Sequence, residues 1–228
     1  MALFLDIARY LLVVLLPLLF LYIMYLMVTK AFRDMGFTTF EAVTIIFLSF
    51  LLGSGFLDGF VGFTFSNIYL FTYHSWDVGI NTGGALIPII LSIYLVLDKK
   101  IPGKQLLIAI SLVTVITFLV TRPVPEKGIV AYFPYWLLPA CIASIASIIM
   151  FWKNYVKAAP VAYISGTIGV LIGADVFHLP TLLSFTSQTT SAAIIGGASV
   201  FDMVFITGIL AVIVDGILLY RQRATVKK

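Results

Sequence analysis

Four aspartates lie in or at the ends of the most apolar stretches of this sequence: Asp58, Asp175, Asp202 and Asp215. Even the lowest estimates put the cost of a carboxylate at the centre of a bilayer at about 2.5–3.5 kcal/mol, so ionisable groups in such stretches are functional candidates. Two carboxylates held together in a low-dielectric interior are expected to share one proton. Such a pair suits proton coupling, cation binding or aspartyl-type hydrolysis.

Asp202 and Asp175 are the two aspartates expected to lie together. We predict Asp202 about six residues inside the last apolar segment, roughly 9 Å from the helix start at 1.5 Å per residue, facing the interior of a helix bundle. Asp175 ends the preceding segment, so a short connection could bring it close to Asp202. The alternative is structural: a hydrogen bond between Asp202 and Thr207, Ser165 or a backbone carbonyl, and a helix-end cap for Asp175.

The other two aspartates are expected nearer the membrane surface. Asp58 ends a glycine-interrupted segment, and it remains a candidate for a substrate or ion site. Asp215 is predicted at the cytoplasmic surface, paired with Arg221 or Arg223.

The composition is that of a polytopic membrane protein with the lipid bilayer as its partner. Hydrophobic residues make up 61% of the 228 residues, charged residues make up 11%, and the mean hydropathy is +1.13. The single cysteine, Cys141, rules out an intramolecular disulfide and a thiolate metal cluster. The net charge of +4 is better explained by membrane topology than by nucleic-acid binding. No cofactor is indicated, and the sequence leaves the oligomeric state open.

The predicted fold is all-α, with about seven transmembrane helices in one membrane domain, residues 1–228. The first apolar run is too long for a signal peptide and is expected to stay as a helix. The segments lie at about 10–29, 40–58, 80–97, 105–121, 130–152, 160–175 and 193–219.

Positive charge is divided unequally between the two sides of this topology. One side carries 11 of the 14 Lys and Arg residues, and the other has only Arg9, Arg122 and Lys127. Because cytoplasmic loops hold an excess of Lys and Arg, we expect a protein of the plasma membrane with its amino terminus outside and its carboxy terminus in the cytoplasm.

Two connections without Lys or Arg, about 59–79 and 176–192, are the unusual part of the chain. Each follows a segment that ends in an aspartate and leads into a Gly-Gly-Ala helix start: Asp58 precedes Gly83 by 25 residues, and Asp175 precedes Gly196 by 21. We interpret this pattern as an internal duplication, with parallel three-helix repeats at about 1–97 and 130–219 joined by a linker helix at about 105–121. Parallel repeats with glycine-interrupted segments are a transporter architecture.

The Gly-Gly pairs have two interpretations. Glycines at a helix start leave backbone N–H groups and a positive dipole end that could bind an anion or a substrate carboxylate. Small residues also let membrane helices approach closely. We take as candidate binding residues Asn81, Gly83, Gly84, Gly196 and Gly197 together with Asp58, Asp175 and Asp202.

No metal site and no catalytic residue is predicted. His74 and Asp77, like Asp175 and His178, are spaced three apart and would share a helix face. The order of the two residue types is reversed between the pairs, which argues against a common metal site.

Three stretches, of which the last two are long and specific, resemble the signature sequences of domain of unknown function 1614, an uncharacterised family of archaeal and bacterial membrane proteins. They are Asn81–Pro88, Ala162–Asp175 and Gly196–Val212, with Ser66-Asn67-Ile68 as a shorter fourth match. His178 stands where the family usually has a polar amide, and Ser199 and Met203 stand where it favours glycine. The resemblance implies no established activity.

A transporter or channel is the leading hypothesis, with a small solute, proton or cation bound between the repeats. The first alternative is a non-catalytic membrane scaffold. The second is an intramembrane aspartyl protease, but the best-known enzymes of that class carry Tyr-Asp before Gly-x-Gly-Asp, whereas here Gly-Ala-Asp175 precedes Phe-Asp202. The sequence has no ATP-binding loop, redox motif or nucleophile triad, which argues against an energised pump and a soluble-type hydrolase. Enzymatic activity is the less favoured interpretation.

Overall fold

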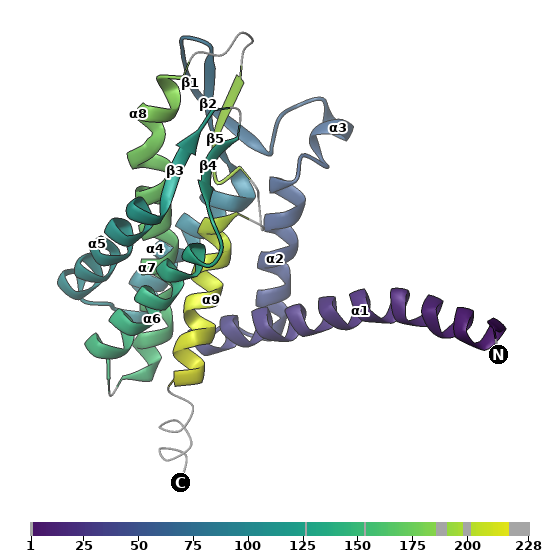
Figure 1. Cartoon of the computed structure of the whole chain (residues 1–228). Coiled ribbons are helices and arrows are strands. Elements are labelled where there is room, and N and C mark those ends of the chain that lie inside the picture. The colour runs from purple at the N-terminus through teal and green to yellow at the C-terminus, as the bar shows by residue number, and fades with distance from the viewer. Residues whose placement is uncertain (1, 126, 153, 186–190, 198–201, 219–228) are drawn as a thin grey trace.

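The computed structural model describes residues 2–125, 127–152, 154–185, 191–197 and 202–218, and it is mostly helical with two small sheets (Figure 1). The longer helices are α1 (Ala2–Met35), α2 (Thr39–Gly53), α4 (Ile87–Lys99), α5 (Gly103–Val120), α6 (Leu138–Met150), α7 (Tyr155–Val170) and α9 (Met203–Leu218). The short helical elements are α3 (Asp58–Val61), α8 (Phe177–Leu183), the π-helical turns η1 (Thr82–Leu86) and η3 (Leu171–Val176), and the 3₁₀ turn η2 (Tyr135–Leu137).

Helix α7 lies at the centre of the bundle and packs against α1, α4, α5, α6 and α9. Small side chains make this central position possible: Ala158, Ala159 and Ala162 are completely buried. At Gly166, a Cβ atom would lie 3.2 Å from the Thr207 carbonyl oxygen of α9, and small residues of this kind let membrane helices approach closely.

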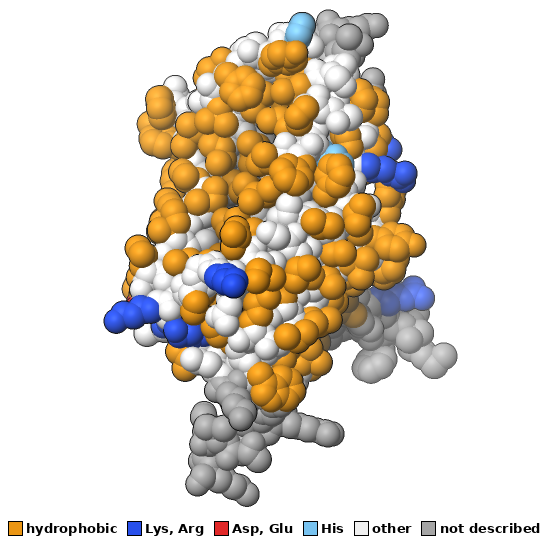
Figure 2. All heavy atoms as spheres, turned by 90° about the vertical axis from the view of Figure 1, so that its left-hand side faces the viewer, with side chains coloured by type: hydrophobic (Ala, Val, Ile, Leu, Met, Phe, Trp, Pro, Cys, Tyr) orange, Lys and Arg blue, Asp and Glu red, His pale blue; other side chains and the backbone are white. Residues whose placement is uncertain are grey.

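Four helical segments are long and apolar enough to cross a membrane: Val13–Met35, Thr82–Lys99, Gly103–Val120 and Val156–Leu183. The helices Thr39–Gly53, Tyr135–Met150 and Met203–Leu218 are apolar but shorter. The seven predicted segments therefore all contain a helix, whereas the count of seven spans is not confirmed. Hydrophobic side chains cover much of the face shown in Figure 2. Exposed hydrophobic residues of α5 include Leu107 and Leu119.

Strands replace helix at the start of three predicted segments, so the all-α prediction is corrected: the segment predicted from 80 begins with the last two residues of β2 (Trp76–Asn81). Residues 130–137 hold the end of β4 (Gly128–Ala131) and the turn η2, and the segment predicted from 193 begins in β5 (Ser191–Ile195). A short apolar run fits a buried strand as well as a helix, and periodicity alone does not separate the two.

The larger sheet has the order β1-β2-β5. Strands β1 (Asn67–Tyr73) and β2 (Trp76–Asn81) form an antiparallel hairpin, and β5 pairs with β2 in parallel, from Trp76 opposite Ser191 to Ile80 opposite Ile195. The second sheet is the hairpin of β3 (Thr121–Val124) with β4. Both sheets lie at the upper end of the bundle in Figure 1.

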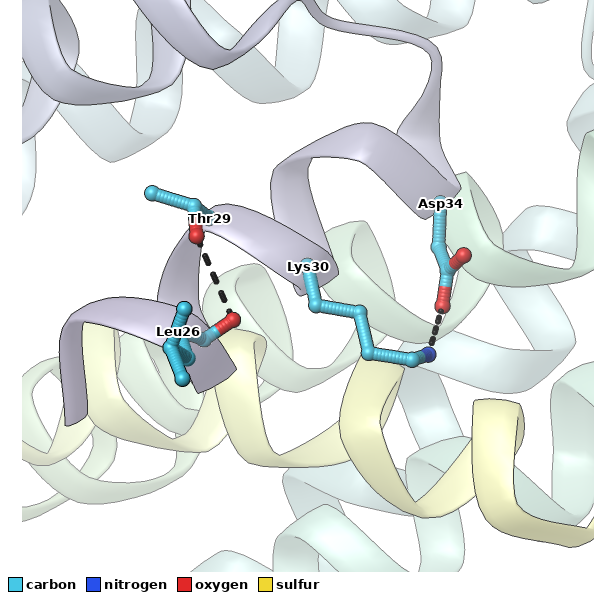
Figure 3. A network of polar contacts seen from close by, with 4 residues as sticks. All are labelled: Leu26, Thr29, Lys30 and Asp34. Atoms are coloured by element: carbon cyan, nitrogen blue, oxygen red, sulfur yellow. Dashed lines mark hydrogen bonds and ion pairs between the residues drawn. The ribbon is translucent and has the colours of Figure 1, made fainter. Parts of the chain in front are cut away.

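Helix α1 extends sideways from the lower part of the bundle in Figure 1, and only its last turns are packed. Phe32 and Met35 are buried, whereas Val13 to Tyr22 are exposed on every side of the helix. Figure 3 shows the polar contacts near its packed end: Lys30 Nζ lies 2.7 Å from Asp34 Oδ2, and Thr29 Oγ1 lies 3.2 Å from the Leu26 carbonyl oxygen.

Candidate functional site

A pocket of about 460 Å³ lies between β5, the turn of the β3–β4 hairpin and the η3–α8 segment. Asp175 and Asp202 both line this pocket, together with Trp76, Lys127 and Gly197. The structure therefore brings together the two aspartates that the sequence suggested could be neighbours.

Asp175 belongs to the π-helical turn η3, which connects α7 with α8. At Gly173 in the same turn, a Cβ atom would lie 2.5 Å from the Thr114 carbonyl oxygen of α5, so this turn can seat against α5 only because Gly173 has no side chain. The Asp175 carboxylate accepts a hydrogen bond from the backbone N–H of Gly196. Its Oδ2 atom is buried and has no hydrogen-bond partner among the described residues. π-helical turns of this kind occur frequently at functional sites.

Asp202 lies directly before α9, so its predicted position six residues inside a helix is wrong. Strand β5 takes up the first residues of the predicted segment, and α9 begins only at Met203. Asp202 Oδ1 accepts a hydrogen bond from the Val204 N–H at 2.9 Å, as an N-terminal helix cap does. The positive end of the helix dipole stabilises a carboxylate at this place.

The carboxylates of Asp175 and Asp202 are close enough to repel each other electrostatically. Of the two side chains named in the structural alternative, Ser165 donates its hydroxyl to the Val161 carbonyl oxygen at 2.7 Å, and the Thr207 hydroxyl has no hydrogen-bond partner among the described residues. A cation or a proton placed between the two carboxylates would relieve their repulsion, which is the chemistry this pair offers.

The two Gly-Gly segments contact each other beside this pocket. Gly196 has a φ of +69°, and a Cβ atom there would lie 2.7 Å from Ala85 Cβ and 2.8 Å from the Gly84 carbonyl carbon. A Cβ atom at Gly83 would lie 1.9 Å from the Ser49 carbonyl oxygen of α2. These approaches favour the packing interpretation of the glycines.

The N–H groups that would have to bind an anion already donate hydrogen bonds to the Asn81 side chain. Its Oδ1 accepts hydrogen bonds from Gly83 N at 3.0 Å and Gly84 N at 2.8 Å. Its Nδ2 donates to the Gly53 carbonyl oxygen and to Asn67 Oδ1, both at 2.9 Å. The buried Asn81 side chain therefore ties α2, β1 and η1 together.

Asp58 lies outside the pocket and holds the loop before β1. It accepts hydrogen bonds from Phe65 N at 2.7 Å, from Ser66 N at 3.1 Å and from the Ser66 hydroxyl. Thr82 Oγ1 donates to the Phe65 carbonyl oxygen at 2.6 Å, which joins this loop to η1. The hydrogen bond from the Ser66 hydroxyl, followed by those from the backbone, lowers the pKa of Asp58, which lies beyond the end of α2.

Replacing Asp58 by asparagine is expected to lower the melting temperature at neutral pH and to make it less sensitive to acid. Because the folded-state pKa lies below the unfolded value of about 3.9, the carboxylate stabilises the fold above that value. This contribution is lost as pH falls through the folded-state pKa. Melting temperatures of both proteins between neutral pH and pH 3 check the expectation, and a parallel decline would contradict it.

The two histidines lie in different parts of the structure. His178 Nε2 lies 3.2 Å from the Phe118 carbonyl oxygen, and its ring stacks on that of Phe118 at 4.5 Å. His74 lies in the turn of the β1–β2 hairpin, and Asp77 accepts a hydrogen bond from Thr72 Oγ1 at 2.6 Å. Within the described residues, no three His, Cys, Asp or Glu side chains are grouped to hold a metal ion.

Trp76 and Lys127 are pocket residues that sequence reasoning missed. Trp76 is 7% exposed, and its Nε1 donates to the Phe185 carbonyl oxygen at 2.9 Å. Lys127 was counted only as an outer charge. Neither position has a local sequence signal, because the pocket forms only when β5 pairs with β2.

Asp215 is completely buried, so its predicted place at the cytoplasmic surface is wrong. Its Oδ1 lies 2.9 Å from the Ser147 hydroxyl of α6. The α6–α9 contact covers this end of α9 and removes Asp215 from solvent. The predicted partners Arg221 and Arg223 lie outside the described residues.

The apolar helices and the mostly helical fold suggest a protein inserted into a membrane, with a carboxylate-lined pocket at one end of the bundle. The chain belongs to the family described as protein of unknown function (DUF1614), whose model matches residues 60–214. This match confirms the resemblance predicted from the sequence. No curated protein and no solved structure shows a significant match to the chain.

Proposed function

We propose that this protein binds a small solute or cation in the Asp175–Asp202 pocket and moves it across the membrane, as a transporter or channel does. The observation that carries the proposal is the pair of neighbouring carboxylates in one pocket, with a buried Asp175 oxygen that has no hydrogen-bond partner among the described residues. A buried polar atom without a partner is costly, and a bound cation, proton or donor group would satisfy it.

The position of the pocket supports transport. Strand β5 forms one of its walls, and β2 contributes Trp76. Each strand leads through a Gly-Gly segment into a helix, and the two strands run parallel. This arrangement is consistent with two parallel repeats that meet at a binding site. The proposed orientation keeps the amino terminus outside and the carboxy terminus in the cytoplasm, because of the predicted distribution of Lys and Arg.

A pair of neighbouring carboxylates is also the catalytic group of aspartyl hydrolysis, but this geometry supports hydrolysis less well than ligand binding. Such a mechanism needs both carboxylates to act on one water. Asp202 Oδ1 is occupied as the cap of α9, and the order of the sequence motifs differs from that of the known intramembrane proteases. Ligand binding is therefore the function that the geometry supports best.

Thermal unfolding of the purified protein, with a panel of alkali cations, divalent cations, amines and amino acids, tests this function. A ligand at a hundred times its Kd should stabilise the wild type by about 2.7 kcal/mol. The Asp175→Asn variant should lose that response, whereas Asp77→Asn, an aspartate of β2 that does not line the pocket, should keep it. A wild type that responds to no member of the panel, or an Asp175→Asn variant with an unchanged response, would contradict the proposal.

A further inference from the structure

Asp215 provides a second buried carboxylate, far from the pocket. The Ser147 hydroxyl lies 2.9 Å from Asp215 Oδ1 and 2.8 Å from the Ser144 carbonyl oxygen. One hydroxyl carries one hydrogen, so it cannot donate fully to both acceptors. A protonated Asp215 would donate to Ser147 while Ser147 donates to the carbonyl, and both contacts would then be good hydrogen bonds.

Buried hydroxyl groups lie between Asp202 and Asp215, in the interface of α6, α7 and α9. The hydroxyls of Thr207 on α9 and Ser144 on α6 are completely buried and have no hydrogen-bond partner among the described residues. On α7, the hydroxyl of the buried Tyr163 lies near that of Thr167, and both side chains pack against Gly208 of α9. Buried hydroxyls without protein partners are commonly completed by ordered water.

These hydroxyls lie at successive heights along the axis of the bundle. At 1.5 Å per residue, Thr207 lies about 8 Å and Asp215 about 20 Å from Asp202 along α9. Helix α7 is antiparallel to α9 and meets it at Gly166, so Tyr163 lies one turn, about 5 Å, beyond Thr207. Helix α6 is parallel to α9 with Ser147 beside Asp215, so Ser144 lies about 5 Å before that carboxylate. Measured along the helix axes, each step is about 8 Å or less.

The inner end of the series reaches a charged group of α1. A Cβ atom at Gly216, the residue after Asp215, would lie 3.1 Å from Asp34 Oδ2 and 3.2 Å from Lys30 Nζ, so the ion pair of Figure 3 packs against α9 one residue from Asp215. The side chain of Lys30 is 54% exposed on the surface of the bundle. Lys157, the nearest charge of α7 that the structure describes, donates instead to the Lys100 carbonyl oxygen at 2.9 Å.

We propose that these groups form a proton path from the Asp175–Asp202 pocket, through Thr207, Tyr163 and Ser144, to Asp215. The inference rests on the proposed function and names the proton as its coupling ion. Each hydroxyl or water accepts one proton and gives up its own, so an O–H bond forms on one side as another breaks on the other. In one transfer, a carboxylic acid in the pocket loses its proton, Asp215 gains one, and Asp215 then releases it to water beside Lys30 and Asp34.

Proton flux into vesicles tests the path. The full chain is reconstituted in phosphatidylcholine–phosphatidylglycerol vesicles with a pH-sensitive dye inside, and a potassium diffusion potential drives protons. Loss of a relay group that contributes about 1–3 kcal/mol should slow the flux by about 5- to 150-fold, and we expect this in Asp215→Asn and in the isosteric Thr207→Val. Ser92→Ala is the matched control, because the buried Ser92 hydroxyl donates to the Pro88 carbonyl oxygen of α4, outside the path.

The outcomes separate this inference from the proposed function. Asp215→Asn should keep the thermal stabilisation by the pocket ligand while it loses proton flux. Wild-type flux that depends on Asp215 and Thr207, without any ligand response, would support the path and contradict solute binding. Wild-type vesicles no more permeable to protons than empty ones, or both path variants conducting at the wild-type rate, would overturn the inference.

Discussion

Gly83→Ala is expected to be the most destabilising single-methyl change in this protein. The added Cβ atom would lie 1.9 Å from the Ser49 carbonyl oxygen and 2.9 Å from Gly53 Cα, and both contacts involve the backbone of α2. A flexible side chain cannot move aside to relieve such a clash, so α2 must separate from η1. The cost should exceed the 1–3 kcal/mol typical of overpacking, at about 3 kcal/mol or more.

Gly103→Ala is the matched control for this experiment. Gly103 begins α5, and a Cβ atom there would meet no heavy atom within 4 Å. Alanine is also favoured over glycine in a helix by about 1 kcal/mol, so this variant should be at least as stable as the wild type. Thermal or denaturant unfolding in detergent compares the two variants. Equal stability of Gly83→Ala and wild type would show that α2 does not pack on η1 in this way.

Asn81→Ala should cause the second large loss. The substitution removes four hydrogen bonds at once and leaves the Gly83 and Gly84 N–H groups, the Gly53 carbonyl and Asn67 Oδ1 without that partner. Each buried group left unsatisfied costs about 1–3 kcal/mol, so the sum should reach about 4 kcal/mol or more. Because β2 leads into this residue, the sheet that supplies β5 to the pocket should loosen as well.

Asn154→Ala separates this effect from a general response to losing an asparagine. Asn154 precedes α7, is exposed, and its side chain makes no capping hydrogen bond. Its replacement should change the free energy of unfolding by no more than about 0.5 kcal/mol. A similar small change for Asn81→Ala, measured under the same conditions, would mean that the four hydrogen bonds do not stabilise the protein.

The sequence located the best-defined helices well. The predicted segments 80–97 and 105–121 correspond to helical segments at Thr82–Lys99 and Gly103–Val120. Lys99, Lys100 and Pro102 separate two long apolar runs there, and charges next to a proline give a clear boundary. The family resemblance also rested on long stretches and is confirmed by the match over residues 60–214.

The two sheets could not be predicted from the sequence. Residues 192–195 are apolar and adjoin Gly196 and Gly197, so they form a hydrophobic run that a helix would also produce. Their strand conformation depends on parallel pairing with β2, more than a hundred residues earlier in the chain. This long-range pairing moved the start of α9 to Met203 and changed Asp202 from a helix-interior residue into a helix cap.

The aspartates of the candidate site could be predicted from the sequence, whereas the residues around them could not. Asp175 and Asp202 could be selected because carboxylates are conspicuous in apolar stretches, and the structure places both in one pocket. Asp215 was selected too, but its burial depends on how α6 covers α9, which no local pattern reveals. In an apolar sequence, residues that face lipid and residues that face the bundle look alike.

Equilibrium binding of the ligand found in the thermal panel, compared between wild type and Asp175→Asn, tests the central claim most directly. The substitution preserves the size of the side chain and removes its charge, and loss of about 2.7 kcal/mol would weaken binding about 100-fold. We predict that loss for Asp175→Asn together with unchanged binding for Asp77→Asn. Equal affinity of wild type and Asp175→Asn would show that the carboxylate pair is not the binding site.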